Sequence, residues 1–442
     1  MIRNRLYIIK RNYLVSASLL EVAAGIILFL AIPLLKLYDC ITLYHAGYVL
    51  LGLGIIMFLL YLIFYWLVCH CIHKGIRYAV NHAIMMNKLR THLKDAGYYV
   101  ERIFRGEKTA VLPHIKIRFD KGFESGKIYI RNNIRQDKRL EDVDISSAIG
   151  RRFIITEQYL AKNADWYVYE FEDTVQNSHL TFHDYRELAA YARETRDYRI
   201  FMDKQTCVPL SSMLLVGATG SGKTYALYST ILSMMNWNNK PTLYFADPKN
   251  SSLVVLGNHL APENTAGEIE DIIALLERFH EKMEKRKVIL QKKLESKLDA
   301  DYRDFGMTAE VFIFDEYASF SSSLSTLDTA TRKKVSMLLR EVVLQGRQLG
   351  FFLWIVMQKA SAEDIPTSIR SNLLLKIVLG RADRTTYQTT FEDSAKDVKA
   401  LDFKPGEGLY YVPGLTRSPK RMSFPTLDFD ILTIVGDGAG VM

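Results

Sequence analysis

The sequence predicts an α/β domain with a mostly parallel sheet, preceded by two transmembrane helices and a small α+β domain. Three observations support this prediction. Two long apolar segments lie near the N-terminus, short apolar strands alternate with helical stretches after residue 201, and a glycine-rich segment joins one of these strands to the next helix. Strands that alternate with helices are typical of a parallel sheet.

The 442 residues leave room for several domains. We expect a membrane anchor at 1–75, a stalk and small α+β domain at 76–200, the α/β domain at 201–420 and a C-terminal tail at 421–442. Hydrophobic residues make up 49% and charged residues 24% of the chain, which excludes a largely disordered protein.

The net charge restricts the partners that the protein is suited to bind, and the cysteines restrict the cross-links and metal sites that it can form. A formal net charge of +8 suits a polyanion or an anionic lipid surface. The alternative is that part of this charge only sets membrane topology. The four cysteines form no framework of spaced pairs, so disulfides are not implied. The run from Cys69 to His73 lacks the paired spacing of structural zinc sites.

The two apolar segments are residues 14–35 and 47–69, and each is long enough to cross a bilayer. The first contains Glu21, which either faces a partner helix or lies near the interface, since a carboxylate at the bilayer centre costs about 2.5–3.5 kcal/mol. The second contains no charged residue and carries Tyr65 and Trp66 near one end, where aromatic residues anchor spans.

Basic residues flank the outer ends of both segments. By the positive-inside rule both termini are cytoplasmic and the connector lies outside. The alternative is that the first segment is a secretory signal. The basic residues are Arg3, Arg5, Lys10 and Arg11 before the first segment, and Lys74, Arg77, Lys88, Arg90 and Lys94 after the second.

The region after the anchor begins with a helical, mixed-charge stretch at 82–96, which we interpret as a stalk. Residues 115–119, 127–132 and 166–171 alternate or are rich in β-branched and aromatic side chains, and this pattern predicts short antiparallel strands. No catalytic cluster is visible there. The domain is either a contact surface for a partner, a seat for the α/β domain or a spacer.

The α/β domain has five strand candidates and three helix candidates. The long charged helix has Lys and Arg side chains that face either DNA or solvent. The strands are expected at Met213–Val216, Thr242–Ala246, Val311–Phe314, Phe351–Met357 and Leu373–Leu379, and the helices at Lys223–Met235, Glu268–Lys297 and Arg332–Leu349.

One segment matches the phosphate-binding P-loop G-x-x-x-x-G-K-[ST] in full, with the strand before it and the helix after it that the motif requires. Glycines let backbone N–H groups surround phosphates, and the helix N-terminus adds a partial positive charge. We expect Lys223 to reach the β- and γ-phosphates of ATP and Thr224 to hold Mg²⁺. The segment is Gly217, Ala218, Thr219, Gly220, Ser221, Gly222, Lys223 and Thr224.

Two further strands end in polar side chains. Asp315 and Glu316 follow the strand Val311–Phe314; Asp315 suits the Mg²⁺ shell and Glu316 suits activation of the attacking water. Gln358 follows the strand Phe351–Met357 at the carboxyl edge, where ligands bind open α/β sheets. It is either a phosphate sensor or a surface residue.

These residues belong to an ordered set that resembles the motor domain of FtsK/SpoIIIE DNA translocases over about 201–413, with a RecA-like P-loop fold. The likeness departs at Lys359-Ala360-Ser361, where the family has Arg-Pro-Ser. The matching segments are Asp247-Pro248-Lys249, Met283-Glu284-Lys285-Arg286, Phe314-Asp315-Glu316-Tyr317-Ala318, Gly346-Arg347-Gln348-Leu349-Gly350 and Gly406-Glu407-Gly408-Leu409-Tyr410.

The resemblance implies a Mg-dependent ATP hydrolase that moves DNA as a homo-hexamer, with ATP between subunits. It also implies an arginine that completes the neighbour's site, for which Arg347 and Arg384 are the candidates. Little chain is left after residue 413 for the winged-helix reader of chromosome translocases.

The chain therefore looks most like the coupling proteins of Gram-positive conjugative elements. Such a protein is a multi-pass protein of the bacterial cell membrane with a cytoplasmic motor, and its partners are a relaxase and mating-channel proteins. The alternatives are an ATPase of a protein secretion system and a scaffold that docks a relaxase.

Overall fold

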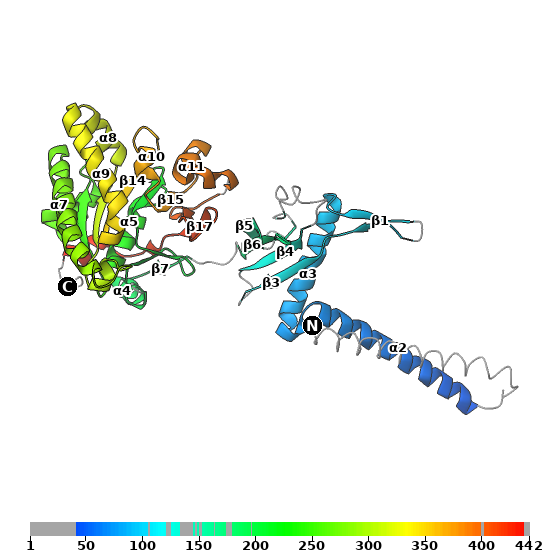
Figure 1. The fold of residues 1–442 in the computed structure, drawn as a ribbon. Helices are drawn as coiled ribbons and strands as arrows, with labels where there is room; N and C mark the ends of the chain where they lie inside the picture. Colours follow the sequence, from blue (N-terminus) through cyan, green and yellow to red (C-terminus); the bar gives the residue numbers. More distant parts are fainter. Residues whose placement is uncertain are drawn as a thin grey trace. The chain divides into compact units, whose positions relative to one another are not determined.

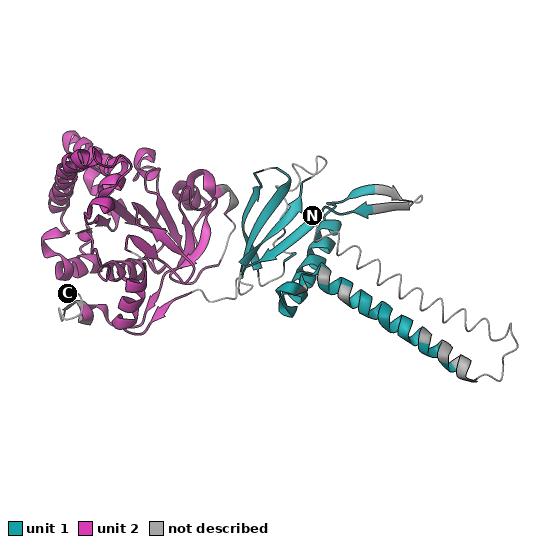
Figure 2. Ribbon diagram, turned by 60° about the horizontal axis from the view of Figure 1, so that its bottom comes forward, with its two compact units in different colours: residues 1–176 teal, residues 177–442 magenta. Residues whose placement is uncertain are grey.

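A computed structural model of the chain describes residues 41–104, 107–120, 125–132, 145, 148–149, 153–162, 164–173, 179–195, 197–398 and 402–436. The chain divides into two compact units, residues 1–176 and 177–442 (Figures 1 and 2).

Unit 1 begins with α2 (Ile41–Cys69), a short 3₁₀ turn η1 (Ile72–Lys74) and α3 (Ile76–Asp95). The first predicted span, 14–35, lies outside the described residues. The second, 47–69, falls within α2, and the structure describes only some of the side chains of this helix. Among the residues that are described, no helix combines the length and apolar character needed to cross a membrane. The two predicted spans are therefore not confirmed.

The rest of unit 1 is a hairpin of β1 (Val100–Phe104) and β2 (Glu107–Val111) and an antiparallel sheet in the order β3-β4-β6-β5. Its strands are β3 (Ile115–Phe119), β4 (Ser125–Arg131), β5 (Phe153–Leu160) and β6 (Trp166–Asp173). Alternate side chains of β3 are buried against α3, so one face of the sheet forms the core and the other faces away. The α+β prediction is confirmed, but β5 was missed because its apolar pattern is broken by Thr156, Glu157 and a bulge after Ile155.

Unit 2 is built on an eight-stranded sheet in the order β12-β11-β13-β14-β10-β15-β16-β17. Neighbours from β12 to β15 pair in parallel, and β16 and β17 pair antiparallel. All five predicted strands are present. The strands are β10 (Met213–Gly217), β11 (Thr242–Ala246), β12 (Thr265–Ala266), β13 (Glu310–Phe314), β14 (Phe351–Met357), β15 (Leu375–Leu379), β16 (Glu407–Tyr411) and β17 (Lys420–Ser423).

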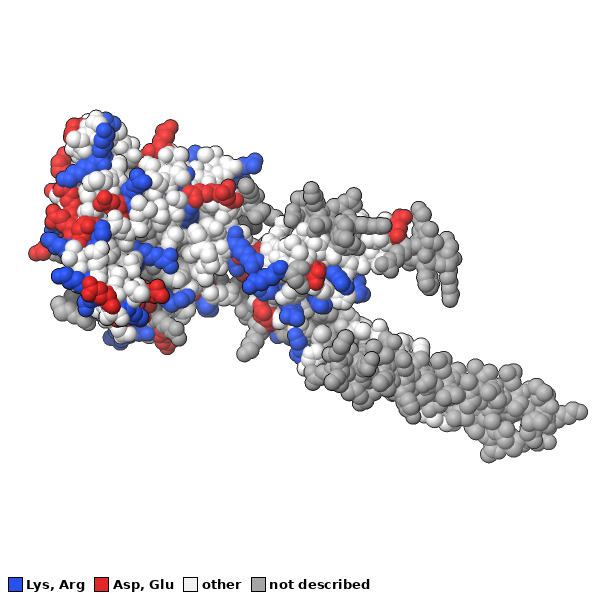
Figure 3. All heavy atoms as spheres, in the orientation of Figure 1, with Lys and Arg blue, Asp and Glu red and all other residues white. Residues whose placement is uncertain are grey.

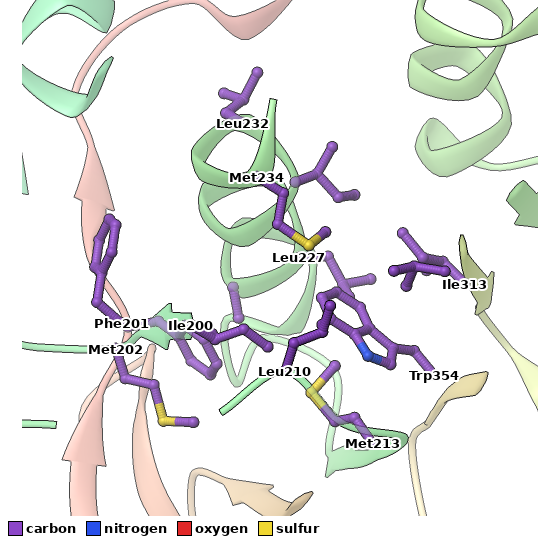
Figure 4. Close-up of a cluster of buried hydrophobic side chains, with 14 of the residues drawn as sticks. Ile200, Phe201, Met202, Leu210, Met213, Leu227, Leu232, Met234, Ile313 and Trp354 are labelled. Carbon is purple, nitrogen blue, oxygen red and sulfur yellow. The ribbon is translucent and has the colours of Figure 1, made fainter. Parts of the chain in front are cut away.

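Helices cover both faces of this sheet (Figure 1), which explains why β10, β13, β14 and β15 are buried along their whole length. One core contains α4 (Tyr185–Glu194), α5 (Lys223–Met234) and α6 (Ser252–Leu260), with α12 (Ile431–Gly436) packed against it. Figure 4 shows this core, where side chains of α5 meet Met213, Ile313 and Trp354 of the sheet. The other core is formed under α7 (Ile269–Leu294), α8 (Tyr317–Ser325), α9 (Thr329–Leu349), α10 (Thr367–Arg370) and α11 (Arg384–Phe391).

Unit 2 begins before residue 201, where the sequence placed the start of the α/β domain. Phe182 and Leu188 are buried in the core of unit 2, and β7 (Thr181–Phe182) pairs with β18 (Thr426–Leu427) from the predicted tail. The hairpin of β8 (Arg199–Phe201) and β9 (Cys207–Pro209) follows. Short 3₁₀ turns complete the unit at η3 (Pro262–Asn264), η4 (Tyr302–Phe305) and η5 (Glu392–Asp397).

Candidate nucleotide-hydrolysis site

Three neighbouring strands of the sheet end at the same edge with the residues predicted to carry chemistry. β14 lies between β13 and β10, and all three run in parallel. The glycine-rich loop follows β10, Gln358 follows β14, and Asp315 and Glu316 follow β13. Because strands are about 4.8 Å apart, the loop and the acidic pair are separated by roughly 10 Å, with Gln358 between them. The predicted meeting of these segments is confirmed.

The loop from 217 to 224 has a backbone that only glycine adopts readily. Gly220 and Gly222 have φ of 80° and 96°. A Cβ on Gly222 would lie 2.5 Å from the backbone nitrogen of Gly406, which itself donates a hydrogen bond of 2.8 Å to the carbonyl oxygen of Ser221. The G-x-G segment near the end of the domain therefore packs directly on the loop.

The loop fits the phosphates of a nucleotide. It leads into the N-terminus of α5, which begins at Lys223, where unpaired N–H groups favour an anion. Ser221 Oγ is a buried hydroxyl for which the described part of the chain offers no hydrogen-bond partner. Lys223 Nζ donates to the carbonyl oxygens of Gly217 (2.5 Å) and Ala218 (3.3 Å), so its side chain lies over its own loop. Burial lowers the pKa of Lys223, against the attraction of Asp315 and Glu316.

The acidic part of the site suits a cation. Burial raises the pKa of Asp315 to about 6, although the Glu316 backbone N–H donates a hydrogen bond of 2.8 Å to its Oδ1. The negative charges of Asp247 and Glu316 add to this effect. A buried carboxyl that holds its proton this strongly is stabilised in its charged form by a divalent ion. Asp315 and Thr224, the first-turn residue of α5, would hold Mg²⁺.

Glu316 has both carboxylate oxygens engaged. Its Oε2 accepts from Lys249 Nζ (2.8 Å) and its Oε1 from Gln358 Nε2 (2.9 Å), while Thr219 Oγ1 donates to Gln358 Oε1 (3.4 Å). Burial acts to raise the pKa of Glu316, but the hydrogen bonds from Lys249 and Gln358 outweigh it and hold the pKa below its ordinary value. Glu316 also has a φ of 48°, a left-handed conformation that is costly outside glycine and is found at functional sites.

Lys249 is a site residue to which sequence reasoning assigned no role. It follows β11, and the buried carboxylate of Asp247 shapes its loop by accepting hydrogen bonds from the backbone N–H groups of Lys249 and Ser251 (both 2.9 Å). The signal was available, because Asp247-Pro248-Lys249 directly follows a strand of the parallel sheet and so lies at the same edge.

The two arginine candidates lie at opposite edges of the sheet. Arg384 begins α11 just after β15, at the edge of the glycine-rich loop, where Lys359 Nζ and Asp383 Oδ2 form an ion pair of 2.8 Å between two neighbouring loops. Arg347 is exposed near the end of α9, just before β14 begins, and so lies at the other edge. It lines a hollow of about 770 Å³ together with Leu298. The structure therefore does not bring Arg347 to the site within one chain.

Arg286, from the Met283–Arg286 segment, also lies at that other edge. It donates to the carbonyl oxygens of Thr308 (2.7 Å) and Leu349 (3.0 Å) and to Oε1 of Glu310 (2.7 Å). Glu310 is only 1% exposed, and Lys282 Nζ donates to its other oxygen at 2.8 Å. This segment therefore fastens α7 to the sheet and is not part of the nucleotide site.

A smaller cavity of about 320 Å³ opens beside the first turns of α5. It is lined largely by apolar and aromatic side chains, and this size and character suit a planar ring such as a purine. Tyr225, which follows Thr224, is 55% exposed there. The other lining residues are Tyr228, Ser252, Val255, Leu256, Phe429, Asp430, Ile431 and Leu432.

Comparison with known proteins finds partial matches to one family. Residues 181–373 match the model of the FtsK/SpoIIIE family. The FtsK domain-containing protein YdcQ of Bacillus subtilis is 27% identical over 187 residues, which are 42% of this chain and 38% of YdcQ. The chain thus spans well under half the length of this curated relative.

Two solved structures are also similar in part. The pCW3 conjugation coupling protein TcpA, in a monomer form with ATPγS, matches 77% of this chain and 94% of its own, at 16% identity and a TM-score of 0.47. The cytoplasmic domain of the type VII secretion ATPase EccC from Thermomonospora curvata matches 54% of this chain and 30% of its own, at 18% identity and a TM-score of 0.39.

The family match covers β10, β13, β14 and the loops that follow them, which are the elements that build the site. The chain therefore has a P-loop ATPase-like fold and, over residues 181–373, is similar to the FtsK/SpoIIIE family.

Proposed function

We propose that this chain is a membrane-anchored DNA translocase that couples ATP hydrolysis to conjugative DNA transfer. The observation that carries the ATPase part is the meeting of the glycine-rich loop, Gln358 and the pair Asp315–Glu316 at one sheet edge, inside a domain similar to the FtsK/SpoIIIE family. The DNA part is supported by the ordered motifs shared with DNA translocases and by the net charge of +8.

Each residue of the site has a distinct role in this proposal. ATP bound with Mg²⁺ supplies the phosphoanhydride bond. The loop and Lys223 would hold phosphate oxygens, and Thr224 and Asp315 would hold the ion. Glu316 would accept a proton from the water whose oxygen bonds to the γ-phosphorus while the bond to ADP breaks; each of its oxygens keeps a lone pair for this beside its hydrogen bond to Lys249 or Gln358. Gln358 links Glu316 to Thr219 and so connects the base with the loop.

In a ring of identical chains, Arg347 and Arg384 could each complete a nucleotide site. A head-to-tail interface joins different surfaces of neighbouring copies and closes into a ring. Arg347, at the edge opposite the nucleotide site, is suited to face the site of the next copy, and Arg384 is suited to act within its own. We propose the homo-hexamer that the resemblance implies, with DNA in its pore.

The anchor and the partners rest on the sequence. The apolar segments 14–35 and 47–69 and the basic residues outside them support a multi-pass protein of the bacterial cell membrane with its motor in the cytoplasm. The relaxase and the mating-channel proteins are the partners that a coupling protein requires.

ATP hydrolysis by the full chain, measured without DNA and with single- or double-stranded DNA, tests the proposal. We expect hydrolysis that DNA stimulates, and we expect Glu316→Gln to keep nucleotide binding but lose about 10²–10⁴-fold in rate. Hydrolysis that neither form of DNA changes would favour a protein secretion ATPase. Full transfer function in Lys223→Ala would leave only the scaffold.

A further inference from the structure

The sheet of unit 1 has an outer face that is basic and aromatic. On β3 the side chains of Lys116 and Arg118 are exposed, while the residues between them are buried against α3. The pairing places Lys116 opposite Tyr129 of β4 and places Arg131 of β4 opposite Trp166 of β6. Because opposite residues point to the same side, these five side chains share one face.

The cations of this face lie over its rings. Lys116 Nζ is 4.0 Å from the centre of the Trp166 ring, and the Arg118 guanidinium is 5.4 Å from the centre of the Tyr129 ring. His114, exposed at the start of β3, packs edge-on against Trp166 with ring centres 5.7 Å apart. A cation over a ring occupies the place that a stacked base would take.

The charge of the face favours an anion. Lys127 pairs with Glu170 at 2.5 Å and neutralises its charge. Glu157 and Glu172 point to the same side, but they lie on the outer strand β5 and at the end of β6, away from Lys116 and Arg131. Burial lowers the pKa of His114, and the positive charges of Lys116 and Arg131 lower it further. Figure 3 shows Lys and Arg side chains gathered on the visible surface of this unit.

We propose that this basic–aromatic face, formed by His114, Lys116, Arg118, Tyr129, Arg131 and Trp166, binds single-stranded DNA. A strand whose bases are free stacks them on Trp166 and Tyr129, while the displaced Lys116 and Arg118 move to its phosphates. A duplex offers the same phosphates but keeps its bases stacked inside, so it cannot use the rings. The inference deepens the proposed function, because it assigns the strand form of the substrate to a domain outside the family match.

The experiment measures binding of the full chain to a labelled thymidine oligonucleotide of about 20 nucleotides, longer than the 4–16 that one such module covers. Its other arms are a duplex of equal length and vesicles of phosphatidylcholine with phosphatidylglycerol. Lys116→Ala with Arg118→Ala should weaken oligonucleotide binding and flatten the dependence of log K on log salt by about 1.4, the share of two phosphates on a single strand.

Further variants distinguish the contribution of base stacking to the affinity from that of charge, and both from a loss of folding. Trp166→Leu should lower the affinity about 5- to 150-fold without changing the salt dependence, and Trp166→Phe should restore most of it, because a ring is retained. Lys88→Ala with Lys94→Ala is the matched control. It removes the same charge from exposed positions on α3, the helix that packs on the opposite face of the sheet, and should bind as the wild type does.

Unchanged oligonucleotide affinity in the Lys116/Arg118 variant, or an equal loss in the Lys88/Lys94 control, would overturn the inference. So would a loss confined to the vesicle arm, which would assign the face to anionic lipid. ATP hydrolysis is measured in parallel. DNA-stimulated hydrolysis with an inert face removes this inference alone, whereas a wild type that hydrolyses no ATP removes the proposed function and leaves oligonucleotide binding to be judged by itself.

Discussion

Arg286→Ala tests whether the long basic helix α7 serves the fold or the DNA. In the structure Arg286 is mostly buried, donates to two backbone carbonyls and one oxygen of Glu310, and lies over the Phe351 ring at 4.6 Å. Its removal leaves Glu310 with Lys282, whose side chain is 46% exposed, and with the hydroxyl of Tyr244. The change therefore weakens the pairing of a buried charge.

The magnitude follows from these contacts. Two lost hydrogen bonds to carbonyl oxygens cost about 1 kcal/mol each. Breaking a buried ion pair costs about 3–5 kcal/mol, and less here because Lys282 remains. We expect a loss of about 3 kcal/mol in the free energy of unfolding of unit 2. The double variant Arg286→Met with Glu310→Gln should lose less than the sum of its single changes, since it leaves no unpaired charge.

Urea unfolding followed by tryptophan fluorescence measures this loss. Replacing Trp66 and Trp166 by Phe confines the signal to Trp237 and Trp354, both buried in unit 2. Lys285→Ala, at an exposed position on the same helix, is the control and should cost little. A loss below about 1 kcal/mol for Arg286→Ala, accompanied by weaker DNA binding, would refute the structural role and assign the residue to DNA.

Three other changes have defined outcomes. Lys249→Ala should raise the pKa of Glu316, which Lys249 now helps to lower, so the acid limb of the pH–rate profile of ATP hydrolysis should move to higher pH; an unmoved limb would contradict the ion pair. Gly222→Ala should weaken binding of an ATP analogue, measured by calorimetry, by about 2 kcal/mol or more, because its Cβ would lie 2.5 Å from the backbone nitrogen of Gly406. A Cβ at Gly220 would meet no atom within 4 Å, so Gly220→Ala should weaken this binding less. Burial, then the charges of neighbouring groups, lowers the pKa of His82 to about 4. As the pH falls, the unfolded chain therefore takes up this proton before the folded one does, and the free energy of unfolding of unit 1 should fall by about 2 kcal/mol between pH 8 and pH 5. His82→Asn should remove that loss in pH-dependent denaturation.

The sequence was sufficient where a local pattern decides the structure. The loop 217–224 and the pair Asp315–Glu316 each follow an apolar strand, and parallel strands bring their carboxyl ends to one edge. The same rule predicted the position of Gln358. The five core strands were found because burial on both faces gives continuous apolar runs, which few other elements of this length show.

Contacts between distant segments were beyond the sequence. The ion pair of Lys249 with Glu316 depends on the order of β11 and β13 in the sheet, and no spacing reveals that order. The start of unit 2 was missed because β7 is only two residues long and pairs with a strand from the far end of the chain. Arg347 and Arg384 share a residue type but lie at opposite edges, a distinction that only the fold makes.

The contact between Gly406 and the loop connects the glycine-rich segment to the hairpin of β16 and β17. The backbone of Gly406 is hydrogen-bonded to Ser221, and the next residue begins β16, which runs antiparallel to β15. Because the loop and the start of this hairpin are hydrogen-bonded to each other, a displacement of the loop would require Gly406 and the start of β16 to move with it.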